Sequence, residues 1–134
     1  MASIRREIVL AVAPETLWAA VRDVGALHTR LVAGFVTACR MDGDARVVTF
    51  ANGVTAREVI VDISDAQRRL VWTSVGGRLT HHNASAQVFA DADNRSRLVW
   101  TADLLPNELE PAIAAMIEQG LVAMKRTVEG SVSV

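Results

Sequence analysis

Two histidines stand side by side in the stretch RLTHHNASAQV, which runs from Arg78 to Val88. Paired imidazoles could chelate a metal ion, or they could form an acid and base couple near neutral pH. The chain holds three histidines in all, and the third, His28, lies apart in the segment GALHTRL. The chemistry open to His81 and His82 depends on which way the fold points each ring.

The residues around this pair alternate in type, as expected of a β-strand with one buried face. One set is His82, Ala84, Ala86 and Val88, and the other is His81, Asn83, Ser85 and Gln87. Neighbouring strand residues point to opposite faces, so the alternation places His82 inside the protein and His81 in solvent. One metal ion could not reach both rings, and we expect neither a metal site nor a cofactor.

Glu58 is a second candidate, because it shares the parity of Ala56 and Ile60 in the alternating stretch VTAREVIV. A carboxylate among small and apolar neighbours is costly to bury unless it is paired, so such a group often marks a site. One interpretation places Glu58 in an internal cavity. The other places it near the sheet edge, in water or in a salt bridge with an arginine such as Arg57 or Arg97.

Three kinds of chemistry remain to be weighed for these groups. His82 could deliver a proton inside a cavity, with Glu58 as its partner. The same two side chains could instead anchor the polar end of a bound ligand. Nucleophilic catalysis by Cys39 is disfavoured, because nothing in its segment GFVTACRM would lower the thiol pKa and a buried structural thiol is the commoner state.

The bulk composition describes one ordinary domain over residues 1–134, with a formal net charge of −1 and 51% hydrophobic residues. A balance this close to neutral offers no electrostatic footprint for nucleic acid. No segment approaches the roughly 20 apolar residues of a membrane span, and the single cysteine suits a reducing compartment. We therefore expect a cytoplasmic protein, monomeric or homodimeric, that neither binds nucleic acid nor inserts into a membrane.

The elements that must position these side chains follow from periodicity and turn residues. Alternation predicts a first strand over 4–12, a proline then opens a helix over 14–24, and a weaker short helix follows over 26–31. The strand-like runs after it are 35–41, 46–51, 54–63, 68–75, 80–90 and 95–105. From Asn107 to Val128 apolar residues recur at helical spacing, which predicts one long amphipathic helix.

This order of elements indicates an α+β architecture, with a curved antiparallel sheet of about six or seven strands around the long helix. Asn52-Gly53 is the strongest hairpin signal between two of the strands. A curved sheet of this kind can enclose a cavity that side chains do not fill.

Several residues are expected to line such a cavity. Trp100 shares the parity of Leu98, so its ring should point inward, and Ala84 and Ala86 leave space on the next strand. On the long helix, a stripe of small and flexible residues is spaced by four and comprises Ala112, Met116 and Gly120. A mid-helix glycine costs roughly 0.5–1 kcal/mol relative to alanine, so either the sheet approaches closely there or a ligand occupies the space.

Four stretches carry a resemblance to a known superfamily: VAPETLWAAVRDV, TAREVIVDISDAQRRLVWTSVGG, HHNASAQVFADADNRSRLVWTADLLP and MIEQGLVAMKRTVE. In their order and spacing they resemble the START-like, or SRPBCC, superfamily with its helix-grip fold, and most closely its polyketide cyclase/dehydrase members. The superfamily includes lipid carriers, plant-hormone receptors and aromatase/cyclases, so the fold alone does not settle a function.

The resemblance adds three expectations about side chains. Both faces around Trp72 are apolar, and the hormone-receptor branch has a pocket-facing aromatic at this position, four residues before Gly76-Gly77. Glu58 matches a glutamate that contacts ligand through water in that branch. The long helix closes the pocket in relatives, which favours a ligand beside Gly120.

We therefore expect a helix-grip domain that binds a small, largely hydrophobic molecule in an internal cavity, as a carrier or a sensor. One alternative is a cyclase or dehydratase that uses His82 and Glu58 as acid and base groups. A further alternative is a protein-interaction module whose cavity is filled. The expected ligand-binding residues are Ala56, Glu58, Trp72, His82, Ala84, Trp100, Ala112, Met116 and Gly120.

Overall fold

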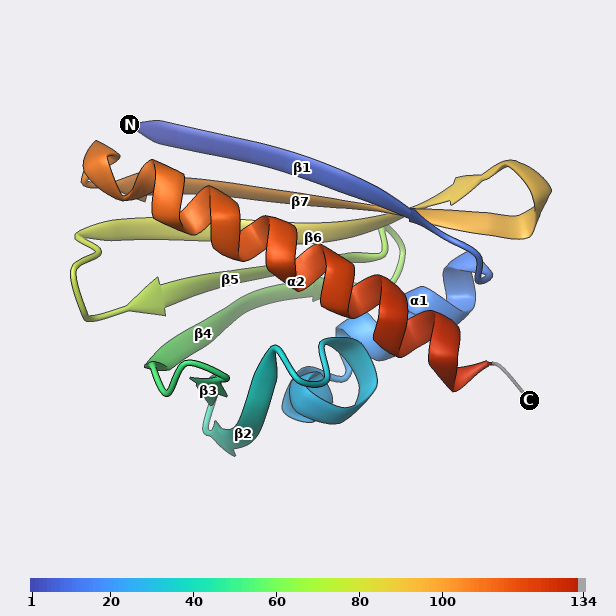
Figure 1. The fold of residues 1–134 in the computed structure, drawn as a ribbon, viewed down its shortest axis with the longest axis horizontal. Coiled ribbons are helices and arrows are strands. Elements are labelled where there is room, and N and C mark those ends of the chain that lie inside the picture. The colour runs from blue at the N-terminus through green and yellow to red at the C-terminus, as the bar shows by residue number, and fades with distance from the viewer. Residues whose placement is uncertain (133–134) are drawn as a thin grey trace.

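A computed structural model describes residues 1–132 and shows one curved, seven-stranded antiparallel sheet with a long helix lying across its concave face (Figure 1). The strands are β1 (Ala2–Leu10), β2 (Val36–Asp42), β3 (Ala45–Phe50), β4 (Thr55–Ser64), β5 (Arg69–Val75), β6 (His81–Asp91) and β7 (Arg95–Leu105). Their order across the sheet is β1-β7-β6-β5-β4-β3-β2, so the first strand pairs with the last and all other neighbours are consecutive hairpins. The expected α+β helix-grip architecture is confirmed.

The helices are α1 (Pro14–Arg22), the short turns η1 (Val24–Ala26), η2 (Leu27–Leu31), η3 (Ala92–Asn94) and η4 (Asn107–Leu109), and the long α2 (Glu110–Ser131). The first strand ends at Leu10 rather than at Val12, because the chain bends before Pro14 begins α1. The short second helix is a single π-helical turn, closed by the Val32 N–H donating to the Leu27 carbonyl at 2.9 Å.

The core lies between the concave face of the sheet and one face of α2. Ile117, Leu121, Met124 and Val128 of α2 are each 4% exposed or less, as the helical spacing of these residues requires. Across the sheet, Leu98 and Leu104 of β7 and Ile4 of β1 supply the matching apolar surface. Within residues 1–132 no helix is long and apolar enough to cross a membrane.

A candidate ligand-binding cavity

A cavity of about 50 Å³ lies between the helices α1 and α2, the π-helical turn and strands β2 to β7. Its walls are mostly apolar, and among the described residues 1–132 its only charged lining residues are Arg46 and Glu58. The lining residues are Val21, Leu27, Leu31, Val32, Phe35, Val36, Arg46, Phe50, Glu58, Leu70, Trp72, Ala86, Trp100, Met116 and Met124. The cavity therefore has an aromatic and aliphatic wall with one polar corner.

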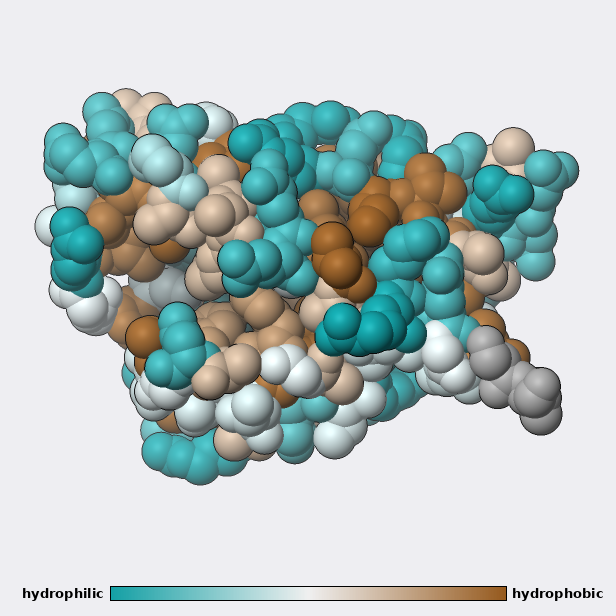
Figure 2. Space-filling model, viewed as in Figure 1, coloured by the Kyte–Doolittle hydropathy of each residue, from teal (hydrophilic) through white to brown (hydrophobic). Residues whose placement is uncertain are grey.

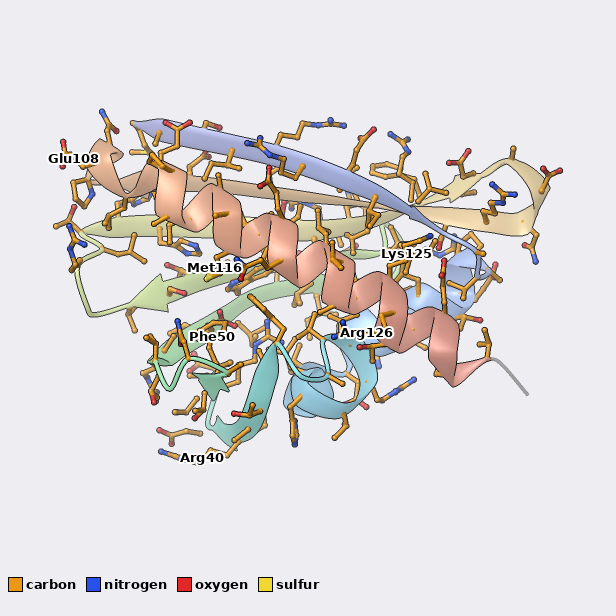
Figure 3. The ribbon with its side chains drawn as sticks, viewed as in Figure 1. Arg40, Phe50, Glu108, Met116, Lys125 and Arg126 are labelled. Carbon is orange, nitrogen blue, oxygen red and sulfur yellow. The ribbon has the colours of Figure 1, made fainter. Side chains whose placement is uncertain are left out.

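Four aromatic rings in two pairs form much of this wall. The Trp72 and Trp100 ring centroids lie 5.8 Å apart at an interplanar angle of 60°, and Phe35 and Phe50 meet edge to face at 5.5 Å. Met116 on α2 and Phe50 on β3 both extend into the space between helix and sheet (Figure 3). Aromatic and methionine side chains at such spacings provide a polarisable surface that suits a planar apolar molecule.

Arg46 and Glu58 form the polar corner as a buried ion pair. They lie directly opposite each other on β3 and β4, and Nε of Arg46 donates to Oε1 of Glu58 at 2.8 Å. Their side chains are only 3% and 11% exposed. Nη1 of Arg46 also donates to the Val24 carbonyl at 3.2 Å, and the guanidinium lies 5.7 Å from the Trp72 ring centroid.

The partner of Glu58 is thus neither Arg57 nor Arg97, the two arginines considered from the sequence. Arg57 pairs with Asp42 on the surface, and Arg97 pairs with Glu7. Glu58 lines the cavity and is not at a solvated sheet edge. Of the two interpretations made from the sequence, the structure therefore agrees with the one that places Glu58 in an internal cavity.

The turn between β3 and β4 explains why Arg46 was missed. Asn52-Gly53 predicts a two-residue hairpin, which would place Val47 opposite Glu58. The observed loop has three residues, because the Phe50 N–H donates to the Val54 carbonyl at 2.8 Å and Gly53 adopts φ +88°. The register therefore shifts by one residue and brings Arg46 opposite Glu58.

His82 lies on the concave face but outside the cavity lining. It stands opposite the buried Leu104, while His81 is exposed, as the alternation predicts. The β5–β6 ladder ends at Trp72 and Ala84, and beyond it Nδ1 of His82 accepts a hydrogen bond from the Ser74 N–H at 2.9 Å. The imidazole thus takes the place of the next backbone hydrogen bond between β5 and β6.

This hydrogen bond fixes the protonation state of His82. A ring nitrogen that accepts from a backbone N–H carries no proton, so Nε2 holds the proton of the neutral ring. Burial, with a smaller contribution from the charge of His81, lowers the pKa of His82 to about 4. At neutral pH the ring is therefore uncharged, and its basic lone pair is already occupied.

His82 and Glu58 are also separated by a strand. Glu58 stands opposite Ser74, and Ser74 in turn binds His82. Two strand spacings separate the backbones of the two residues by roughly 10 Å. The two side chains therefore do not form a direct acid and base couple in this structure.

Four of the nine expected ligand-binding residues line the cavity, namely Glu58, Trp72, Trp100 and Met116. The five that lie outside the lining are Ala56, His82, Ala84, Ala112 and Gly120. Ala84 is buried within the core, whereas Ala112 is exposed on α2, although the neighbouring Ile113 packs against the core. Phe35 and Phe50 were not expected, since both stand at the ends of strand-like runs.

Gly120 is covered by a side chain of the sheet rather than left open for a ligand. A Cβ added at Gly120 would lie 2.8 Å from Cζ3 of Trp100 and 3.4 Å from Cε2 of Phe35. The close approach of the sheet, one of the two explanations open from the sequence, therefore accounts for the glycine.

Gly120→Ala is expected to destabilise the protein by about 1–3 kcal/mol, although alanine normally favours a helix, because Trp100 must move. Gly130→Ala in the same helix is the matched control, since its Cβ would meet nothing within 4 Å. Urea unfolding of both variants measures the difference. Trp100→Phe in the Gly120→Ala background should restore stability, and a stabilising Gly120→Ala would refute the packing argument.

A surface groove of about 580 Å³ adjoins the cavity. Its lining residues are Gly34, Phe35, Ala51, Ala115, Glu118, Gln119, Val122, Ala123 and Arg126. Phe35 lines both the groove and the cavity. Figure 2 shows this face hollowed beside α2, with apolar residues exposed in the hollow.

The other reactive groups of the described chain do not line the cavity. Cys39 is half-buried, its thiol donates to the Val24 carbonyl at 3.7 Å, and burial raises the pKa of the thiol. Such a thiol is a poor nucleophile at neutral pH. Across residues 1–132, no three His, Cys, Asp or Glu side chains gather in a way that could hold a metal ion.

The long helix gripped by a curved antiparallel sheet defines the helix-grip class of proteins. A family model described as polyketide cyclase / dehydrase and lipid transport matches residues 1–129, and the chain belongs to this family. No curated protein matches the sequence significantly.

Solved structures share the fold at low sequence identity. An uncharacterised protein from Bacillus thuringiensis superposes with a TM-score of 0.85 at 17% identity, over 95% of this chain and 98% of its own. A Thermobifida fusca protein gives 0.76 at 25% identity, over 96% and 91%. A point mutant of norcoclaurine synthase from Thalictrum flavum, in complex with a transition-state analogue, gives 0.76 at 18% identity, over 98% and 96%.

Proposed function

We propose that this protein binds a small, largely apolar molecule in the cavity between α2 and the sheet, as a carrier or a sensor. The supporting observation is the aromatic wall of Phe35, Phe50, Trp72 and Trp100, which surrounds a single buried polar corner. An apolar pocket with a few convergent polar groups is the usual form of a small-molecule site. The family's description, which includes lipid transport, agrees with this reading.

The size of the cavity sets a condition on binding. Pockets that hold drug-sized ligands measure roughly 300–1,000 Å³, whereas this cavity of about 50 Å³ has room for a few water molecules. Ligand entry must therefore displace side chains. Phe35 and Met116 are suited to this, because both are only half-buried and Phe35 borders the groove outside.

A titration with cumene, a compact apolar molecule, tests the proposal. Binding in the cavity should shift the indole N–H signals of Trp72 and Trp100 in ¹⁵N-correlated NMR spectra. Trp18 provides an internal reference, because its indole donates to Asp65 at 2.9 Å and does not line the cavity. Shifts confined to Trp72 and Trp100 would support binding, and no shift at saturating cumene would favour the interaction-module alternative.

A cavity-filling variant makes this test specific. Ala86→Val adds two methyl groups to the cavity wall and should weaken cumene binding roughly tenfold, or about 1.4 kcal/mol, the equivalent of nearly two buried methylene groups. Ala90→Val, on the same strand but exposed, is the matched control and should bind like the parent protein. Equal binding by both variants would place cumene elsewhere.

The enzyme alternative, with His82 and Glu58 as acid and base, receives less support. The neutral His82 ring has its basic nitrogen engaged by Ser74 and lies outside the lining. Native mass spectrometry of protein purified from its own organism distinguishes the two functions. A co-purified molecule that leaves unchanged supports carriage or sensing, whereas one that is converted during incubation supports the enzyme.

A further inference from the structure

The buried ion pair has hydrogen-bonding capacity that the protein does not use. Arg46 donates through Nε and Nη1, and Glu58 accepts through Oε1, while Nη2 and Oε2 bond to nothing within residues 1–132. In that part of the chain, the fully buried side-chain atoms without a partner are only His28 Nδ1 and Ser96 Oγ. Nη2 and Oε2 therefore reach accessible space, and the space that both residues line is the cavity.

The charge of this corner is already balanced. One guanidinium faces one carboxylate at 2.8 Å, and no other charged residue in the described part of the chain lines the cavity. A carboxylate ligand would bring a second negative charge into a desolvated site that has one positive charge to offer. A neutral oxygen acceptor could take a hydrogen bond from Nη2 without disturbing that balance.

We infer that Arg46 and Glu58 together select the ligand's polar group: a neutral carbonyl oxygen that accepts from Nη2 of Arg46, in preference to a carboxylate. This inference rests on the proposed function and specifies the class of ligand, an apolar molecule with a ketone, ester or similar carbonyl. Arg46 acts as the specificity-determining donor, and Glu58 sets the net charge that the site accepts.

Three molecules of nearly equal shape distinguish the contributions of a neutral carbonyl, a carboxylate and the apolar body of the ligand to binding. Acetophenone carries the neutral carbonyl, benzoate carries the carboxylate, and cumene carries neither. Each is titrated into the full-length protein, with the indole signals of Trp72 and Trp100 as the readout and Trp18 as the reference. In the parent protein, acetophenone should bind at least roughly tenfold more tightly than benzoate, because the carboxylate must leave water for a balanced site.

Glu58→Gln provides the decisive variant. It preserves an acceptor for Nε of Arg46 but leaves the guanidinium charge uncompensated, so a carboxylate ligand becomes its counter-ion. The benzoate-to-acetophenone affinity ratio should rise roughly 10- to 100-fold, as expected when a charge-assisted hydrogen bond forms. Benzoate should also raise the melting temperature of this variant and leave that of the parent protein unchanged.

A second variant keeps the test decisive if Glu58→Gln fails to fold. Arg46→Met combined with Glu58→Leu replaces the ion pair with apolar side chains, which buried pairs often tolerate. The acetophenone-to-cumene affinity ratio should then fall roughly 3- to 10-fold relative to the parent, the effect of one lost hydrogen bond.

The outcomes separate the two proposals. If cumene binds but neither variant changes the affinity ratios, the selectivity of Arg46 and Glu58 is wrong and the proposed function stands. If none of the three molecules moves the signals of Trp72 and Trp100, the proposed function fails and the selectivity fails with it.

Discussion

Replacement of Glu58 with alanine is expected to lower the free energy of unfolding by about 3–5 kcal/mol. The loss is large because Arg46 is 3% exposed and would keep its charge inside the protein with no counter-ion. A domain of this size has a total stability of roughly 5–15 kcal/mol, so the variant should be close to unfolding at physiological temperature. Urea unfolding followed by circular dichroism measures the difference.

Two comparisons show whether burial is the cause. Asp42→Ala removes an ion pair of similar length, 2.7 Å to Arg57, but both of its side chains are largely exposed, so its loss should be far smaller. Adding Arg46→Met to Glu58→Ala removes the stranded charge and should recover most of the stability. Equal losses for Glu58→Ala and Asp42→Ala would contradict the assignment of Arg46 and Glu58 as a desolvated pair.

Acidification is expected to destabilise the protein through His82. The folded-state pKa of about 4 lies below the unfolded value of about 6.5, so between these pH values the unfolded chain binds a proton that the folded chain does not. Stability is therefore fully present above pH 6.5, falls as the pH drops, and levels off below about pH 4. The pKa difference corresponds to about 3 kcal/mol.

His82→Asn isolates this contribution, because the asparagine Oδ1 can accept from the Ser74 N–H in place of Nδ1 and does not titrate. Carboxylates titrate in both proteins, so the difference between their pH profiles reports His82. His81→Gln, which alters an exposed ring, should retain the pH-dependent loss. A direct NMR titration that places the pKa of His82 near 6.5 would rule out both the buried neutral ring and this pH dependence.

The sequence is sufficient to predict the fold because the strands keep their alternation and three of the hairpin turns are marked by glycine. Trp100 and His82 point to the concave face, as their parity requires, because one wrong step would turn a polar strand face toward α2. Met116 and Trp72 also line the cavity, as expected. The placements of Trp100, His82 and Met116 follow from local periodicity, whereas both faces around Trp72 are apolar and its placement rests on the family resemblance.

The parts that could not be predicted depend on contacts between distant elements. Arg46 stands near the start of β3, where a charged residue is typical of a solvated strand end, and its burial depends on contacts with Glu58, Val24 and Trp72 from other elements. Gly120 is explained by the Trp100 ring from a strand more than a dozen residues away. The imidazole of His82 accepts the Ser74 N–H two residues beyond the point where the backbone pairing of β5 with β6 ends. None of these three relations is visible in the spacing of residues along the chain.

The three-residue turn from Ala51 to Gly53 has an evolutionary consequence. It sets which β3 residue stands opposite Glu58, and so it decides whether the carboxylate meets a guanidinium or a valine. Loss of a single codon in this surface turn would therefore turn β3 over and bring Val47 opposite Glu58 in place of Arg46, although no lining residue had itself been substituted. In this fold, a lineage could acquire a new ligand preference through the length of a loop, and alignments restricted to pocket residues would not record the change.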